Sequence, residues 1–207
     1  MEIKPLHGTT TIGLVCSDGI VLGGDSRASM ETFIASKEAI KIYRINDFLG
    51  MTIAGSVGDA VYLVKLLQTQ SELYKMEENR LLNPTAAASI LSLVMQENKM
   101  VPFYVELIIG GLNNGKPELY TIDPLGCYIK ESKFASTGSG SLTALGYLES
   151  IYNQEMTTQE GVKHALKALQ IAMSRDSATG NNTLIAAITK KGFKFYSKEE
   201  LDKLSKA

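Results

Sequence analysis

The sequence PLHGTTTIG (residues 5–13) places three threonines directly after a glycine. Threonine is β-branched and favours extended backbone, so this stretch predicts the start of a strand that runs to residue 16. A second apolar and β-branched run covers residues 19–28, and the Asp-Gly pair at the junction is a hairpin signal. We therefore predict that the fold opens with an antiparallel strand pair that has the threonines at its beginning.

Strands and helices alternate in groups along the rest of the chain. Further strands are predicted at residues 41–45, 48–55, 104–112, 118–124, 126–134, 183–189 and 192–196. A helix pair is predicted after the first four strands and another after the next three. This order predicts an α+β fold, with two antiparallel sheets packed face to face and helices outside.

Capping residues predict where the first helix pair begins. Ser56 is the expected N-cap of the first helix. Asn83, followed by a proline at the first helical position, opens the second helix, which should end before Pro102.

The second helix pair and the chain end show similar signals. Residues 141–152 predict a short helix, and Thr157 and Glu160 form a capping box ahead of an apolar stripe. The end of the chain, residues 197–207, is rich in lysine and glutamate and is predicted to be a solvated helical tail.

Composition excludes several function classes. The 207 residues are 44% hydrophobic with a formal net charge of -1, which predicts a single domain without a nucleic-acid or anionic-membrane partner. Apolar runs fall short of the ~20 residues that a membrane helix needs. The first residues lack the order of a signal peptide, so we predict a cytoplasmic protein.

Cysteine and histidine are scarce. Cys16 and Cys127 have no CxxC spacing and predict neither a zinc site nor a disulfide scaffold, and we expect both to be buried. His7 and His164 are the only histidines and are expected on the surface. They leave little material for a metal site or a Ser-His-Asp triad, so no metal or cofactor is predicted.

Six segments, in this order and at these intervals, resemble the β-type subunits of archaeal 20S proteasomes. They are GTTTIG, GGDSRAS, AIKIYRI around Lys41, MTIAGSVGDA, STGSGS and SRDSATG. The resemblance covers nearly the whole chain. It implies the four-layer αββα sandwich of the N-terminal nucleophile hydrolases, in which the nucleophile is exposed by removal of a propeptide.

The chemistry of threonine agrees with this implication. An N-terminal threonine can use its own α-amino group as the base, and such a group has a pKa of about 7.7–8.0. Cleavage between Gly8 and Thr9 would create that amine, and Gly8 lets the Thr9 hydroxyl approach the preceding carbonyl. Residues 1–8 would then be an autocatalytically removed propeptide, and residues 9–207 a single peptidase domain.

The resemblance also assigns partners to the proposed nucleophile Thr9. Asp25 matches the acidic partner, Lys41 the basic partner, and Arg27 a supporting position. A buried ammonium near the Thr9 hydroxyl would favour the alkoxide, and the carboxylate would keep that ammonium charged.

Four further residues complete the implied site. Gly55 matches the backbone N–H of the oxyanion hole, and Ser139, Asp176 and Thr179 match groups that hydrogen-bond around the threonine. Two positions depart from the family pattern. Thr179 stands where serine is usual, and Leu184 stands where many archaeal relatives have an acidic residue.

Specificity is implied by four apolar residues. The positions of Ala28, Ala39, Ile53 and Val57 line the pocket for the substrate residue before the cut in the family. We therefore expect cleavage after large apolar residues such as leucine, tyrosine or phenylalanine.

The resemblance implies an endopeptidase that degrades unfolded proteins to peptides inside a barrel. In the family, β-type subunits form seven-membered rings that stack on each other and are capped by α-type rings. A regulatory ATPase acts through the α ring. The expected partners are therefore other β-type and α-type subunits and unfolded proteins.

Alternative interpretations remain at this stage. The chain could be a structural ring subunit that stays unprocessed, or the peptidase subunit of the simpler bacterial two-component protease, which is typically shorter and lacks the RDSATG-like segment. Thr10 and Thr11 are interpreted as plain strand residues. Asp176 could form a helix-end ion pair with Arg175, and Ser139 or Ser141 could merely cap a helix.

Overall fold

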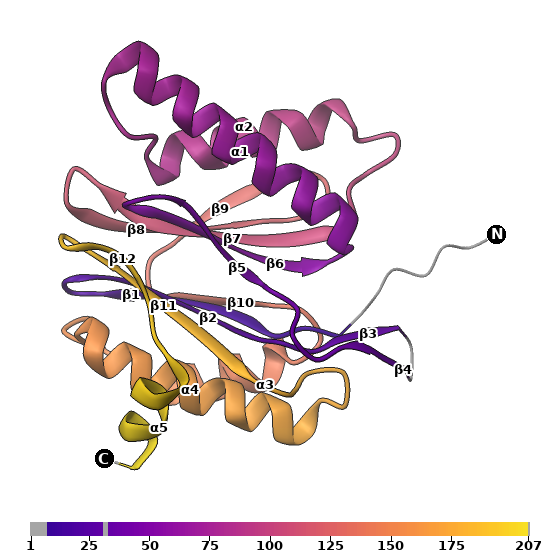
Figure 1. The fold of residues 1–207 in the computed structure, drawn as a ribbon, viewed down its shortest axis with the longest axis vertical. Coiled ribbons are helices and arrows are strands. Elements are labelled where there is room, and N and C mark those ends of the chain that lie inside the picture. The colour runs from indigo at the N-terminus through magenta and orange to yellow at the C-terminus, as the bar shows by residue number, and fades with distance from the viewer. Residues whose placement is uncertain (1–7, 31–32, 207) are drawn as a thin grey trace.

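The computed structural model describes residues 8–30 and 33–206. In this part of the chain, two sheets pack face to face and each carries helices on its outer face. The result is four layers in the order αββα (Figure 1). The predicted α+β class and layer order are confirmed. The expected propeptide, apart from Gly8, lies outside the described residues, as does His7.

The first sheet contains the two N-terminal strands and the last two strands. Its order is β10-β1-β2-β11-β12, and every neighbouring pair is antiparallel. The strands are β1 (Thr11–Cys16), β2 (Gly19–Asp25), β10 (Phe134–Thr137), β11 (Thr183–Thr189) and β12 (Gly192–Phe195). The hairpin predicted for the start of the chain is confirmed, and β2 lies at the centre of this sheet.

The second sheet is a run of hairpins in chain order, β5-β6-β7-β8-β9. Its strands are β5 (Ile42–Asn46), β6 (Leu49–Gly55), β7 (Val105–Asn113), β8 (Lys116–Ile122) and β9 (Tyr128–Glu131). A short pair, β3 (Ala28–Met30) and β4 (Phe33–Ser36), projects from the end of the sandwich and was not predicted (Figure 1).

The prediction of one strand over residues 126–134 is wrong. The structure divides this segment into β9, which pairs with β8, and β10, which pairs with β1 in the other sheet. One strand cannot hydrogen-bond within two stacked sheets, so the chain crosses between them after Glu131. The crossing brings Thr137 opposite Thr11.

The helices follow their predicted caps. They are α1 (Val57–Glu78), α2 (Pro84–Glu97), α3 (Ser141–Ile151), α4 (Thr158–Arg175) and α5 (Lys198–Lys206). Ser56 and Asn83 accept hydrogen bonds from the backbone N–H groups of Asp59 and Ala86, and both halves of the Thr157–Glu160 capping box are formed. The helices α1 and α2 cover the second sheet, whereas α3 and α4 cover the first (Figure 1).

The C-terminal helix α5 differs from the predicted solvated tail. The segment is helical, but Leu201 is only 5% exposed and belongs to the core between α4 and the first sheet. Leu204 packs against the same core. Residues three positions apart lie on one face of a helix, so this apolar pair docks α5 onto the domain while its charged face stays in solvent.

The two cysteines have different environments. Cys16 is buried, as predicted, and burial raises the pKa of its thiol to about 12, with smaller contributions from Asp18 and Glu160. Cys127 is exposed, so the prediction that it is buried is wrong. It lies between β8 and β9, where the chain turns outside the core.

Among the helices of residues 8–30 and 33–206, none is both long and apolar enough to cross a membrane.

Candidate active site

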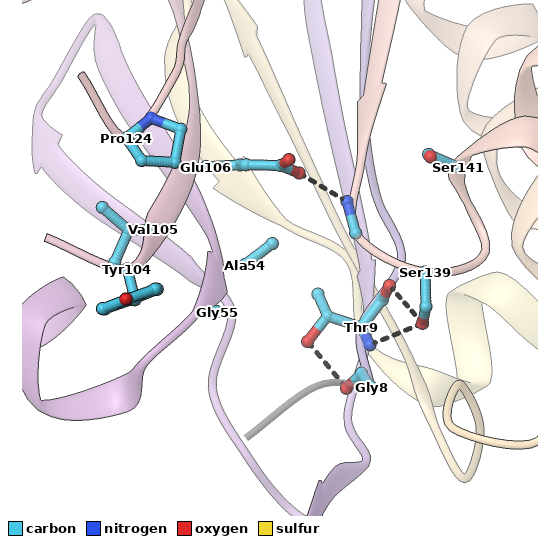
Figure 2. Close-up of a pocket in the computed structure, with 11 residues that line it drawn as sticks. Gly8, Thr9, Ala54, Gly55, Tyr104, Val105, Glu106, Pro124, Ser139 and Ser141 are labelled. Atoms are coloured by element: carbon cyan, nitrogen blue, oxygen red, sulfur yellow. Dashed lines mark hydrogen bonds between the residues drawn. The ribbon is translucent and has the colours of Figure 1, made fainter. Parts of the chain in front are cut away.

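Thr9 lies two residues before the first residue of β1, and only 8% of it is exposed. Its nitrogen is still part of the peptide bond to Gly8. The Thr9 Oγ1 donates a hydrogen bond of 2.7 Å to the Gly8 carbonyl oxygen (Figure 2). Lys41 Nζ donates to the same oxygen at 3.2 Å. The Gly8–Thr9 junction is therefore held by a hydroxyl and a lysine side chain.

Gly8 occupies a position that has no room for a side chain. A Cβ atom there would lie 1.9 Å from Oγ of Ser29 and 2.6 Å from the carbonyl oxygen of Ala178. The second contact is to backbone, which cannot rotate away. Any larger residue at this position would move the Gly8 carbonyl away from the Thr9 hydroxyl and the Lys41 ammonium that hydrogen-bond to it.

Asp25 ends β2, is fully buried and accepts four hydrogen bonds. Its Oδ1 accepts from Lys41 Nζ at 2.7 Å and from Thr10 N at 2.9 Å. Its Oδ2 accepts from Arg27 N at 3.0 Å and Gly180 N at 2.9 Å. These donors come from separate parts of the chain, so the Asp25 carboxylate joins the lysine to the backbone on both sides of it.

Lys41 precedes β5 and is 4% exposed. Burial lowers the pKa of its ammonium from the ordinary value of 10.5, and the negative charge and hydrogen bond of Asp25 oppose this effect. A lowered pKa means that the Lys41 ammonium releases its proton more readily than a solvent-exposed lysine would.

Arg27 follows β2, and its side chain hydrogen-bonds to the loop after α4. The guanidinium Nε donates to Asn181 Oδ1 at 2.9 Å and Nη1 donates to the carbonyl oxygen of Ser177 at 2.6 Å. It therefore braces the loop after α4, which contains Gly180, a donor to Asp25.

Ser139, Asp176 and Thr179 form a hydroxyl–carboxylate network. Ser139 Oγ and Thr179 Oγ1 each donate to Asp176 Oδ2 at 2.5 Å. The Thr9 N–H donates to Ser139 Oγ at 3.4 Å, a long hydrogen bond (Figure 2). Because the Thr179 hydrogen goes to the carboxylate, its oxygen accepts from Thr10 Oγ1 at 2.8 Å.

The Asp176 carboxyl has a lowered pKa. Burial alone would raise it, but hydrogen bonds from Ser139, Thr179 and Ala178 N favour the ionised form and outweigh the burial. Within the described residues, no ion pair joins Asp176 to Arg175.

Thr10 and Thr11 do more than extend a strand. The Thr10 N–H donates to Asp25, and the Thr10 hydroxyl pairs with the Thr179 hydroxyl, so Thr10 connects these two residues. The Thr11 hydroxyl accepts from Thr52 at 3.0 Å and pairs with Thr137 at 2.7 Å, which links the two sheets behind the site. The run of three adjacent threonines at the start of the strand is the sequence signal that could have indicated these roles.

Two cavities flank Thr9, and both are also lined by Gly8 and by Gly55 at the end of β6. The first cavity, about 100 Å³, is lined by the four residues predicted for the specificity pocket. These are Ala28, Ala39, Ile53 and Val57. Lys41 and Tyr43 also line it, so the predicted pocket residues do meet beside the proposed nucleophile.

The second cavity, about 360 Å³, lies between the end of the second sheet and the loop before α3 (Figure 2). Tyr104, Glu106, Pro124, Ser139 and Ser141 contribute to its walls. The sequence interpretation missed Glu106, although it is the one charged residue in the apolar strand VELIIGGLN.

Leu184, the second departure from the family pattern, lies on β11 opposite Gly24 and packs against the core between the sheets. It is therefore not part of the network around Thr9. Within residues 8–30 and 33–206, no group of three histidine, cysteine, aspartate or glutamate residues could hold a metal ion.

Two antiparallel sheets packed between helix layers are the arrangement of the N-terminal nucleophile hydrolase fold. A family model described as "Proteasome subunit" matches residues 6–188. The chain therefore belongs to the proteasome subunit family, and its relatives place it among the β-type subunits.

Three archaeal relatives illustrate the similarity. The proteasome subunit beta of Methanocaldococcus vulcanius is 49% identical over 96% of this chain and 90% of its own length. Those of Methanocaldococcus jannaschii and Methanosarcina mazei are each 46% identical over 96% of this chain, and over 89% and 94% of their own lengths.

Proposed function

We propose that this β-type subunit is a threonine endopeptidase with Thr9 as its nucleophile. The observation that carries the proposal is the position of Lys41 Nζ, which lies 2.7 Å from Asp25 and 3.2 Å from the Gly8 carbonyl oxygen. A buried lysine of lowered pKa is thereby placed at the bond whose cleavage would free the Thr9 amine.

Activation would begin at the Gly8–Thr9 peptide bond. Thr9 Oγ1 attacks the Gly8 carbonyl carbon, and Lys41 polarises that carbonyl through its hydrogen bond. The C–N bond breaks, the nitrogen of Thr9 takes up the hydroxyl proton, and Gly8 is left as an ester on Oγ1. Water then hydrolyses the ester, which releases the Gly8 carboxylate and leaves a free hydroxyl and amine on Thr9.

The free amine would then serve as the base in peptide cleavage. It accepts the Oγ1 proton, the oxygen attacks the substrate carbonyl, and the amine returns the proton to the leaving nitrogen as the C–N bond breaks. Water then hydrolyses the ester left on Oγ1, which releases the other half of the substrate as a carboxylate and restores the Thr9 hydroxyl. Gly55 would supply the N–H for the tetrahedral oxyanion. Ser139, Asp176 and Thr179 would orient the Thr9 amine, and Lys41 would lower the free energy of the alkoxide.

The cavity around Ala28, Ala39, Ile53 and Val57 would hold the residue before the cut. Its lining of small and branched apolar side chains supports a preference for large apolar residues. Fluorogenic peptides test this preference, and faster cleavage after arginine or glutamate than after leucine or tyrosine would contradict it.

We infer from membership of the family that the chain assembles with other β-type and with α-type subunits. We infer that the subunit degrades unfolded proteins inside such a particle, with an ATPase acting through the α ring. The cytoplasmic location expected from composition stays a prediction.

The decisive experiment is the intact mass of the chain after co-expression and assembly with its α-type partner. A mass that starts at Thr9 is expected, together with peptide cleavage that Thr9→Ala abolishes while the particle still assembles. A chain that keeps residues 1–8 and cleaves no peptide would instead point to a structural ring subunit or a stalled precursor.

A further inference from the structure

The second cavity beside Thr9 has a different character from the apolar one. Its volume is about 360 Å³, and its lining includes the hydroxyl residues Tyr104, Ser139 and Ser141 and the acidic residue Glu106. Lysine and arginine are absent from its lining, whereas Lys41 lines the first cavity. The two cavities share Thr9 and Gly55, so a peptide bound across Thr9 reaches both.

The position of the Thr9 nitrogen decides which half of the substrate enters the second cavity. In the proposed reaction, this nitrogen returns its proton to the leaving amine. It lies 3.4 Å from Ser139 Oγ, and Ser139 lines the second cavity but not the first. The half of the substrate that follows the cut therefore departs on the Ser139 side, into the second cavity.

Glu106 is held over this cavity from β7. Its Oε2 accepts a hydrogen bond of 3.0 Å from the Gly138 N–H, directly before Ser139, and Figure 2 shows the side chain reaching across to that loop. Within the described part of the chain, its second oxygen, Oε1, accepts no hydrogen bond. A carboxylate with one oxygen anchored presents its other oxygen as an acceptor for a cationic side chain.

We propose that the second cavity binds the side chain of the residue immediately after the cleaved bond, and that Glu106 makes this subsite favour lysine or arginine. The inference rests on the proposed function, because it takes Thr9 as the nucleophile. It adds a specificity determinant on the leaving-group side of the site.

Internally quenched peptides test the proposal, because they contain a real residue after the cut. The assembled particle is given peptides with leucine before the cut and lysine, arginine, glutamine or glutamate after it. The wild type should show kcat/KM about threefold to tenfold higher for lysine than for glutamine, and lowest for glutamate, as a partly exposed ion pair allows.

The variant Glu106→Gln removes the charge and keeps an acceptor for the Gly138 N–H. It should bring the lysine-to-glutamine ratio close to one. Glu149→Gln, a matched change at an exposed carboxylate on α3, should keep the wild-type ratio. A wild-type ratio near one, or a preference that survives Glu106→Gln, would overturn the inference.

A peptidyl-coumarin substrate tests Thr9 as the nucleophile separately from the preference of the second cavity, because its leaving group carries no side chain after the cut. Wild-type cleavage of this substrate that Thr9→Ala abolishes, combined with no discrimination after the cut, would overturn this inference alone. Absence of cleavage of every peptide would overturn the proposed function and the inference with it.

Discussion

Lys41 Nζ lies 2.7 Å from Asp25 Oδ1, and both side chains are almost completely buried. The two residues are unequal partners. Asp25 also accepts backbone N–H groups from Thr10, Arg27 and Gly180, whereas the recorded acceptors of the lysine are Asp25 and the Gly8 carbonyl. The pair therefore combines a structural junction with a reactive group.

This asymmetry predicts different stabilities for two variants. Asp25→Ala leaves a buried ammonium and three N–H groups without their acceptor, and should lower the free energy of unfolding by about 3–5 kcal/mol. Lys41→Met leaves the carboxylate its three N–H donors and should cost less, while both variants lose peptide cleavage. Thermal and urea unfolding measure the difference, and equal losses would contradict the assigned roles.

The hydrogen bonds of Thr179 predict that its hydroxyl matters more than its methyl group for peptide cleavage and stability. Thr179→Ser keeps the donor to Asp176 and the acceptor for Thr10, so cleavage should stay near the wild-type rate. Thr179→Val removes both and should cost about 1–3 kcal/mol, because buried partners are left unsatisfied. Peptide kinetics and thermal melting of both variants check this, and a valine variant that matches the serine variant would refute it.

Asp176 predicts a pH dependence of stability. Its pKa in the folded chain lies below the ordinary value of 3.8, so ionisation favours the folded state above that pH. This contribution is lost as the pH falls through the folded pKa. The melting temperature of the wild type should therefore exceed that of Asp176→Asn at neutral pH, and the gap should narrow on acidification below about pH 4. A gap that does not change with pH would argue against the ionised carboxylate.

The docking of α5 predicts a large effect of one leucine. Leu201→Ala removes a buried side chain and should destabilise the fold by about 2–5 kcal/mol. Lys203→Ala, an exposed change on the same helix, is the control and should change stability by less than about 0.5 kcal/mol. Denaturant unfolding distinguishes them, and similar values for both would restore the interpretation of a solvated tail.

The two cysteines should react differently. Burial raises the pKa of Cys16 to about 12, so iodoacetamide at pH 8 should leave it unmodified while Cys127 reacts in the folded subunit. Denaturation should make both available. Peptide mass mapping after alkylation checks this, and rapid native labelling of Cys16 would show that it is accessible.

Local signals explain why much of the fold could be predicted. The caps at Ser56, Asn83 and Thr157 and the hairpin before Gly19 depend on residues within a few positions, and each lies where expected. The wrong strand prediction has a cause outside the local sequence. Whether residues 126–134 form one strand or two depends on which sheet offers a partner edge, and that information is carried by β1 and β8.

The candidate site likewise has a part that local sequence predicts and a part that depends on tertiary packing. Adjacent residues and local periodicity predicted the Gly8–Thr9 junction and most of the elements in their order, but not β3, β4 or the division of residues 126–134. The resemblance implied that Asp25, Lys41 and Ser139 are partners of Thr9, but the hydrogen bonds that join these residues around the Gly8–Thr9 junction are seen only in the folded chain. Packing two sheets face to face brings distant strand ends together, and no local pattern in the chain records those contacts.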